Sequence, residues 1–313
     1  MRTGRFFAVL ALSLVGSTAS RAQLTDAERS AVLIQHGYEV SDGIIYKVAG
    51  SYEAKLDVFR PREARAPSPV VITIHGGGWV AGTKEGAVLQ PLPFMAMGFA
   101  VVNVEYRLGG TSLAPAAVED CLCALHWVGR NARKYNFDLG KVIVTGRSAG
   151  GHLALTTSLI PSSAGFEHGC AYEDDDSGAG PWKDARPKVA AVINWYGITD
   201  VADLLQGPNI RSYAVSWLGS LPNREDLAKR LSPLGYVRPG LPPILTIHGD
   251  ADTVVPYSHA VRLHEALTKA GVKNQLLTVR DGRHGMFTAK QELRAFEAIR
   301  AFLQDAGIAP AAK

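Results

Sequence analysis

The sequence predicts an α/β fold, a mostly parallel, doubly wound sheet of about eight strands with flanking helices and a small cap or insertion. Two observations support this prediction. Short continuous apolar runs such as Val70–Ile74 recur along the chain, and such runs are typical of strands that helices cover on both faces. Helical patterns of about 10–20 residues alternate with these runs, as they do where a helix connects successive parallel strands.

The first half of the chain opens with a helix and an antiparallel hairpin. Residues 24–38 carry an amphipathic pattern after Thr25 and Asp26, which is typical of an N-capped helix. Apolar and polar residues then alternate in two segments around a short turn, and the proline-bearing residues 61–69 form a surface connector. The predicted elements are strands at 43–48, 52–60, 70–74 and 99–105, and helices at 24–38, 85–97 and 115–135.

The second half continues the alternation around one irregular segment. Residues 161–187 are rich in Gly, Ser, Pro and Asp and lack periodicity, so we predict an insertion on the strand-end side of the sheet. Its acidic run at 173–176 lacks the alternating spacing of a calcium loop and is interpreted as solvated. The predicted elements are a strand and a helix that meet at Ser148, strands at 189–195, 242–248 and 275–279, short helical pieces over 200–230 that cap the site, and helices at 257–270 and 290–305.

The composition suits a globular protein with a sizeable core. The 313 residues are 47% hydrophobic and 20% charged, and no repeat or linker interrupts the series, so one domain over 23–313 is the simplest organisation. The first 22 residues hold three arginines and no acid, so the rest of the chain carries a formal net charge of +1 rather than +4. The basic balance therefore does not indicate a nucleic-acid partner.

Residues 1–22 have the pattern of a cleavable signal peptide. Two arginines precede the apolar run Phe6–Val15, and small residues lead to Ser20-Arg21-Ala22, an acceptable cleavage site. The apolar run is about half the length of a membrane-spanning helix. We therefore expect cleavage near Ala22, a secreted or periplasmic protein, and no membrane span.

Three cysteines are too few for a disulfide scaffold, and an odd number leaves one unpaired within the chain. Cys121 and Cys123 lie two apart on a predicted helix and so point to different sides. Two alternatives stay open: Cys170 bridges to one of them in an oxidising compartment, or the thiols are free and buried.

The segment Gly146-Arg147-Ser148-Ala149-Gly150 lies between a predicted strand and a predicted helix. Such a sharp turn exposes the hydroxyl of the central serine, and it requires glycine at both ends to avoid collisions. A glycine-rich turn with an ordinary serine N-cap is the alternative interpretation. The nucleophile hypothesis additionally requires an oxyanion loop upstream, then an acid and a histidine downstream, each after a strand.

A candidate oxyanion loop, His75-Gly76-Gly77-Gly78-Trp79, directly follows the strand at 70–74. Successive glycines allow backbone N–H groups to turn toward a ligand. Acyl transfer develops negative charge on a carbonyl oxygen and needs preorganised donors there. The alternative is a flexible turn, but its combination with the serine motif favours the oxyanion interpretation.

An acid and a histidine follow in the required order. His284 lies in the loop after the strand at 275–279 and would act as the general base, while an aspartate fixes its tautomer. Asp250 follows its strand too closely to reach across the sheet edge, so we favour Asp252. Asp281 is the third candidate, although its place before His284 suits a loop turn.

The other histidines have structural interpretations. His152, in the first turn after Ser148, is expected to be packed or hydrogen-bonded, and His75 and His248 end strands and brace their loops. No His/Cys/Asp cluster has zinc spacing, and no glycine-rich loop has the pattern of a nucleotide-binding loop. We therefore expect no metal and no cofactor.

Together these motifs, with Tyr106-Arg107-Leu108 and His248-Gly-x-x-Asp252-x-x-Val-Pro256, resemble the α/β-hydrolase esterases related to hormone-sensitive lipase. The likeness is greatest to exported bacterial feruloyl and acetyl-xylan esterases of the BD-FAE type and covers residues 45–305. The resemblance implies a triad of Ser148, Asp252 and His284 and an oxyanion hole of the N–H groups of Gly77, Gly78 and Ala149. Arg147 is a departure, because relatives often carry Asp, Gly, Glu or Gln there.

The function that we expect is a secreted serine carboxylester hydrolase that works through an acyl-enzyme on short or aromatic acyl esters. Feruloyl or acetyl esters of plant polysaccharide are one substrate class, and small esters or aryl formamides are the alternative. A non-catalytic binding protein would usually lack a triad member, and all are present here. The oligomeric state stays open.

Four further residues are substrate-binding candidates. Trp79, Tyr106 and Trp195 would supply an aromatic wall for a phenolic acid, although aromatic residues in such places are more often core. Arg147 would either meet an acidic substrate or form a salt bridge inward.

Overall fold

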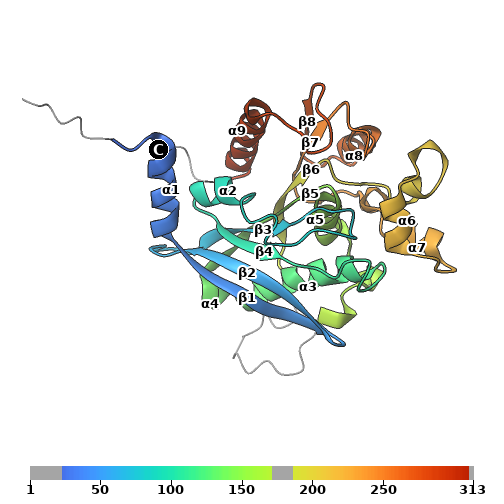
Figure 1. Ribbon diagram of the computed structural model, residues 1–313, viewed down its shortest axis with the longest axis horizontal. Helices are drawn as coiled ribbons and strands as arrows, with labels where there is room; N and C mark the ends of the chain where they lie inside the picture. The colour runs from blue at the N-terminus through green and yellow to red at the C-terminus, as the bar shows by residue number, and fades with distance from the viewer. Residues whose placement is uncertain (1–22, 171–185, 310–313) are drawn as a thin grey trace, which may run out of the picture. The chain divides into compact units, whose positions relative to one another are not determined.

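The computed structural model describes residues 23–170 and 186–309 (Figure 1). They divide into two compact units after His36. The first unit holds most of α1 (Asp26–Gly37), the predicted leading helix, on which no residue is buried. Thr25 and Glu28 exchange hydrogen bonds at its start, so each satisfies a backbone N–H that the first turn leaves free. The second unit begins at Gly37.

Eight strands of the second unit form one sheet in the order β1-β2-β4-β3-β5-β6-β7-β8. The pairs β1–β2 and β2–β4 are antiparallel, and the other pairs are parallel. The predicted α/β fold is thus confirmed. The strands are β1 (Tyr38–Ala49), β2 (Tyr52–Pro61), β3 (Ser68–Ile74), β4 (Ala100–Val104), β5 (Phe137–Arg147), β6 (Val189–Trp195), β7 (Ile244–Gly249) and β8 (Asn274–Val279).

The order of the strands determines where a crevice opens at the edge of the sheet. The chain proceeds from β3 to β4 on one side, and then returns to place β5 on the other side of β3. Such a reversal opens a crevice beyond the carboxyl ends of the two adjacent strands. Ile74 pairs with Gly146 in the parallel β3–β5 register, so the segments after both strands emerge side by side.

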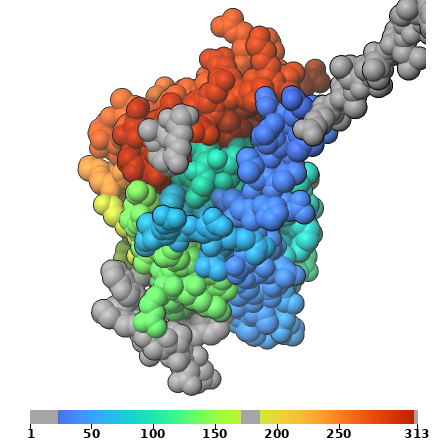
Figure 2. All heavy atoms as spheres, turned by 90° about the vertical axis from the view of Figure 1, so that its left-hand side faces the viewer, coloured from blue at the N-terminus to red at the C-terminus, as the bar shows by residue number. Residues whose placement is uncertain are grey.

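Helices cover the sheet through two separate sets of buried side chains. Val142 and Val144 of β5 belong to the same cluster as residues of α3 and α5, whereas the buried Ile143 between them does not. α2 and α9 meet through Phe94 and Phe296, whose ring centroids are 5.9 Å apart, and their atoms are adjacent in Figure 2. The helices of this unit are α2 (Leu92–Ala96), α3 (Ala116–Arg130), α4 (Ala132–Tyr135), α5 (Ala149–Leu159), α6 (Ser212–Leu218), α7 (Arg224–Arg230), α8 (Ser258–Lys269) and α9 (Ala289–Asp305).

Two predicted helices are shorter in the structure. The helix predicted at 85–97 is formed only over Leu92–Ala96, and turns precede it. Pro91 and Pro93 lack the N–H that a helix interior needs, which explains the late start. The helix predicted at 115–135 breaks at Asn131, whose side chain donates to the carbonyl of Trp127 at 2.9 Å and thereby completes the last turn of α3.

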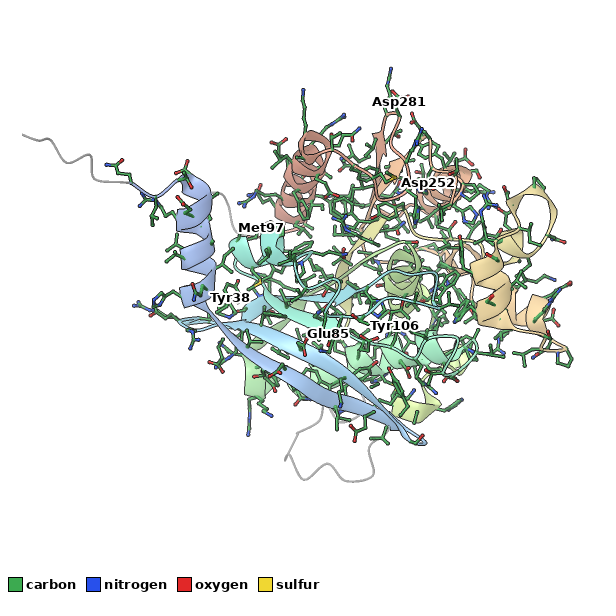
Figure 3. All side chains as sticks on the ribbon, in the orientation of Figure 1. Tyr38, Glu85, Met97, Tyr106, Asp252 and Asp281 are labelled. Atoms are coloured by element: carbon green, nitrogen blue, oxygen red, sulfur yellow. A yellow bond between two sulfur atoms is a disulfide. The ribbon has the colours of Figure 1, made fainter. Side chains whose placement is uncertain are left out.

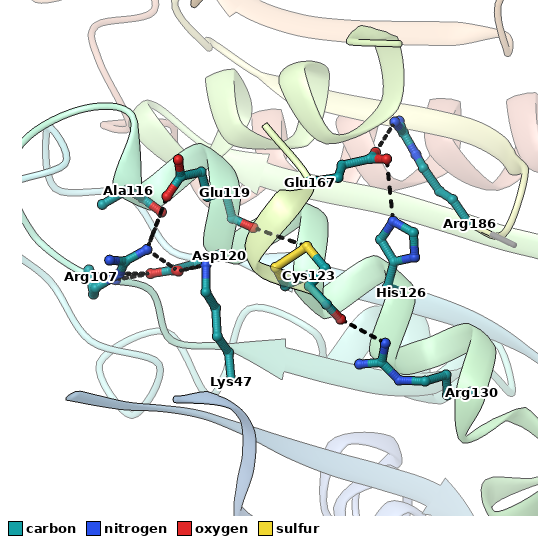
Figure 4. Close-up of a disulfide and its surroundings, with 11 residues drawn as sticks. Lys47, Arg107, Ala116, Glu119, Asp120, Cys123, His126, Arg130, Glu167 and Arg186 are labelled. Atoms are coloured by element: carbon teal, nitrogen blue, oxygen red, sulfur yellow. Dashed lines mark hydrogen bonds and ion pairs between the residues drawn. A yellow bond between two sulfur atoms is a disulfide. The ribbon is translucent and has the colours of Figure 1, made fainter. Parts of the chain in front are cut away.

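A disulfide joins Cys123 of α3 to Cys170, which ends the short 3-10 helix His168–Cys170 (Figure 4). Cys121 is buried and unbonded, so the bridged alternative holds and selects Cys123. The acidic run at 173–176 and the leader at 1–22 lie outside the described residues. Within the described ranges, the helices are too short or too polar to cross a membrane.

Candidate active site

Ser148 occupies a strained turn between β5 and α5. Its φ is 57° and its ψ is −121°, a conformation that L-residues rarely adopt. A Cβ on Gly146 would overlap the carbonyl of Gly150, and one on Gly150 would overlap the carbonyl of Ile74. The two glycines therefore allow the turn to press against β3, which leaves the Ser148 hydroxyl projecting at the carboxyl edge of the sheet.

The structure brings Ser148, His284 and Asp252 together. His284 Nε2 lies 2.8 Å from Ser148 Oγ, and His284 Nδ1 lies 2.6 Å from Asp252 Oδ2. Asp252 comes from the loop after β7 and His284 from the loop after β8, so three separate strand ends supply the group. This is the hydrogen-bonded arrangement of a nucleophile, a base and an orienting acid.

Asp252 is buried and well supplied with donors. Its Oδ1 accepts from the backbone N–H groups of Val254 and Val255 at 2.8 and 2.9 Å, and its Oδ2 lies 3.2 Å from His248 Nε2. Burial alone would raise the pKa of Asp252, but the hydrogen bonds from His248 and His284 outweigh burial and hold the pKa well below its usual value. The carboxylate therefore stays ionised beside His284.

His248, predicted from the sequence only to brace its loop, also donates to Asp252. Its Nε2 lies between two acceptors, Asp252 Oδ2 and the carbonyl oxygen of Val255 at 3.1 Å, so this nitrogen carries the proton. The ring is fully buried. The sequence signal for this contact is the pattern His-Gly-x-x-Asp, because it places His248 and Asp252 on either side of the end of one strand.

The competing aspartates lie elsewhere. Asp250 and Asp281 are both exposed, and Asp250 Oδ1 accepts from the Asp281 backbone N–H at 2.6 Å. In Figure 3 Asp281 is at the outer end of its loop, away from Asp252. Asp281 has a φ of 55°, which suits the turn role that its position predicts.

The glycine loop after β3 has a backbone that few other residues could adopt. Gly77 and Gly78 have φ values of 116° and 62°, and a Cβ on Gly77 would overlap the carbonyl of Ala81. Ala149 is the first residue of α5, where N–H groups have no acceptor within the helix. The loop and Ser148 border the same cavity.

This cavity has a volume of about 590 Å³. Its wall includes the glycine loop, Ser148 and His284, together with Arg147, Tyr196 and Tyr213. Tyr196 follows β6 directly, and its ring packs edge-on against His284 at a centroid distance of 4.8 Å. Its position at a strand end was the available signal for Tyr196, whereas nothing in the local sequence of α6 marks Tyr213.

The expected aromatic wall of Trp79, Tyr106 and Trp195 is wrong. All three are at most 2% exposed, and none borders the cavity. Trp79 stacks on Trp217 and donates its indole N–H to His152 Nδ1 at 3.1 Å, and the Tyr106 hydroxyl donates to the His75 carbonyl. These side chains are part of the core rather than of the cavity wall. Burial of a large aromatic surface is strongly stabilising, which favours this position.

His152 is hydrogen-bonded as expected. Its Nε2 lies 2.8 Å from the carbonyl oxygen of Leu231, while its Nδ1 accepts from Trp79, so the ring is a single neutral tautomer. Burial lowers its pKa to about 4. His152 thus anchors the tryptophan that follows the glycine loop.

Arg147 borders the cavity and forms the inward salt bridge. Its guanidinium contacts both carboxylate oxygens of Glu292, at 2.9 and 3.0 Å, and lies 4.4 Å from the centre of the Trp195 ring. Glu292 was not identified from the sequence, because 145 residues separate the two. Within residues 23–170 and 186–309, no group of three or more His, Cys, Asp or Glu side chains could hold a metal ion.

The chain is similar in sequence to known ester hydrolases. Over 270 residues the chain is 28% identical to the esterase LipQ of Mycobacterium tuberculosis, covering 81% of this chain and 60% of LipQ. It is 27% identical to the probable carboxylic ester hydrolase LipM of the same organism, covering 66% and 46%. The chain therefore spans between about half and three fifths of these two relatives.

Solved structures agree with this result. The propionate-bound esterase Est2 of Thermogutta terrifontis is 25% identical with a TM-score of 0.70, covering 88% of this chain and 97% of that one. A truncated carbohydrate esterase from gut microbiota is 28% identical with a TM-score of 0.68, covering 86% and 97%. Among sequence families, TAP-like proteins match residues 226–312. BD-FAE matches residues 56–267, and the chain belongs to this family of α/β-hydrolase esterases.

Proposed function

We propose that this protein is a serine carboxylic ester hydrolase that works through an acyl-enzyme. The observation that carries the proposal is the continuous pair of hydrogen bonds from Ser148 through His284 to Asp252 at the wall of the cavity. Serine is a weak nucleophile unless an adjacent base removes its proton. In this group His284 is placed to remove the proton of Ser148, and Asp252 orients His284 for that step.

The reaction takes place in two halves. His284 Nε2 accepts the proton of Ser148 as Oγ forms a bond to the ester carbonyl carbon, and the N–H groups of Gly77, Gly78 and Ala149 stabilise the oxyanion. His284 then donates the proton to the departing alkoxide, which leaves as an alcohol. Water repeats the attack on the acyl-enzyme with His284 as base, and this releases the acid and restores Ser148.

Short or aromatic acyl esters are the proposed substrates, with feruloyl and acetyl esters of plant polysaccharide as the first class. Membership of the BD-FAE family supports this choice, as do one structural neighbour with bound propionate and another described as a carbohydrate esterase. The cavity of about 590 Å³ is large enough for either acyl group. General small-ester hydrolysis and aryl-formamide hydrolysis are the alternatives.

Export is part of the proposal. The leader pattern at residues 1–22 supports it, with cleavage near Ala22. The Cys123–Cys170 disulfide is also typical of oxidising compartments such as the periplasm and the exterior. Mass determination of the protein recovered outside the cytoplasm tests the cleavage site.

The principal test measures product release from 4-nitrophenyl acetate, methyl ferulate and feruloylated, acetylated xylan, with Ser148→Ala as the control. Ferulate or acetate released from xylan by the unmutated protein alone supports the whole proposal. Cleavage of 4-nitrophenyl acetate alone retains the mechanism and removes the polysaccharide assignment. Failure of a fluorophosphonate to label Ser148 in folded protein would exclude the serine mechanism.

A further inference from the structure

Arg147 is the residue directly before Ser148, and it borders the cavity. Among the described residues that border this cavity, it is the only Arg or Lys, and none is Asp or Glu. An uncompensated guanidinium at this place would attract anionic acyl groups. The charge preference of the cavity therefore depends on what balances Arg147.

Glu292 balances it in a rigid geometry. Two parallel contacts of 2.9 and 3.0 Å join the guanidinium to the carboxylate, and the side chains are only 19% and 26% exposed. Solvent screens a partly buried pair of this kind less than it screens surface pairs. Glu292 also lies in the first turn of α9, where the helix dipole stabilises a negative charge.

The surroundings hold the pair in place. The Trp195 ring lies 4.4 Å from the guanidinium carbon, and Tyr196 interacts with the same guanidinium. Burial lowers the pKa of Arg147, but the hydrogen bond that Arg147 donates to Glu292, the charge of Glu292 and the interactions with Tyr196 together outweigh burial and raise it. The guanidinium therefore stays charged, and because the Glu292 carboxylate pairs with it directly, the ion pair contributes no net charge to the wall.

The charge of Asp252 acts in the same direction. Asp252 lies behind His284, 2.6 Å from its Nδ1, and is ionised. With Arg147 already neutralised, an acyl group that ends in a carboxylate meets no other Arg or Lys among the described residues that border the cavity. It meets instead the charge of Asp252, which repels it.

We infer that the Arg147–Glu292 pair makes the cavity selective for uncharged acyl groups, and that Glu292 is a specificity-determining residue through its effect on Arg147. The inference rests on the proposed ester hydrolysis and refines its substrate class. It assigns Arg147 to charge balance rather than to recognition of acidic substrates. Removal of the Glu292 charge alone would convert the wall into a binding site for anionic acyl groups.

The test compares two esters that differ only at the end of the acyl chain, 4-nitrophenyl hexanoate and 4-nitrophenyl hemiadipate. The quantity measured is the ratio of kcat/KM for the anionic ester to that for the neutral ester, at low ionic strength. We expect Glu292→Gln to raise this ratio about tenfold and Arg147→Gln to lower it. The double variant should return it to near the starting value, because both charges are then absent.

Glu297→Gln is the matched control, since it removes an equal charge from an exposed position on the same helix. Its ratio should stay unchanged. Loss of folded protein cancels in the ratio, because both esters are measured on one preparation. An unchanged ratio in Glu292→Gln overturns the inference, whereas failure of the unmutated protein to cleave either ester contradicts the proposed function itself.

Discussion

The carboxyl edge of the sheet and the segment before residue 171 are held by different means. At the edge, Trp79, Ser148 and Tyr196 follow β3, β5 and β6 and have φ values of 62°, 57° and 41°. Each such residue costs about 1–3 kcal/mol. The segment at 162–170 has little regular structure, and a disulfide and ion pairs hold it instead.

The difference shows what each kind of region requires. Backbone strain persists where neighbours determine the geometry: Ser148 N–H donates to the Trp195 carbonyl at 2.9 Å, and Tyr196 N–H donates to the Ile247 carbonyl at 2.8 Å. The segment at 162–170 lacks such a strand neighbour. There Arg186 and His126 both contact Glu167, and Cys170 is covalently bound to α3 (Figure 4).

The largest expected effect is at the strained serine. Ser148→Gly should lower kcat/KM for 4-nitrophenyl acetate at least about a thousandfold, because the nucleophile is gone. It should also be about 1 kcal/mol more stable than Ser148→Ala, since glycine adopts positive φ without strain. Urea unfolding measures the second quantity. Equal stability of the two variants would mean that the turn is not strained.

The disulfide should contribute mainly to stability. Cys123→Ser opens a loop of 47 residues, which should lower the free energy of unfolding by about 2–4 kcal/mol. Cys170→Ser removes the same bond and should give a similar loss. Small-ester kcat at 25 °C should change less than about twofold, because neither cysteine borders the cavity. A tenfold loss of kcat in folded variants would show that the two regions are coupled.

His248 should matter through Asp252 rather than through substrate. His248→Phe removes one donor to the carboxylate, and we expect kcat to fall about tenfold with little change in KM. His248→Gln places an amide N–H near the lost donor and should restore part of kcat. A change confined to KM would contradict a positioning role.

The smallest expected effect concerns Glu167. Burial raises the pKa of this carboxyl. Hydrogen bonds from His126 and Ser162 and the charge of Arg186 act in the opposite direction and outweigh burial, so the pKa falls to about 2. A lowered pKa stabilises the fold above the ordinary value near 4.5, and this contribution disappears as the pH falls toward 2. Glu167→Gln should therefore be about 1 kcal/mol less stable at pH 7, since solvent screens part of the interaction.

Unfolding in urea between pH 2.5 and 7 measures this difference, and it should shrink on acidification. Glu265→Gln, at an exposed position on α8, serves as the control. A gap for Glu167→Gln that stays constant across this range would show that the carboxylate charge does not stabilise the segment.

Local chemistry was sufficient to predict the sheet and the candidate triad. Glycines at 146 and 150 are demanded by close backbone contacts, and continuous apolar strands by burial on both faces, so both leave direct traces in sequence. The choice of Asp252 over Asp250 followed partly from distance along the loop and partly from the family resemblance, and the structure brings Asp252 to His284. The catalytic roles of these residues stay predictions.

Contacts between distant segments could be decided only by the folded chain. Trp79 and Trp195 follow or end strands, as Tyr196 does, yet packing buries the tryptophans and leaves Tyr196 on the cavity wall. The pairing of Arg147 with Glu292 and of Cys170 with Cys123 joins residues 145 and 47 positions apart. Such partners are selected by the three-dimensional course of the backbone, which no local pattern of residue types encodes.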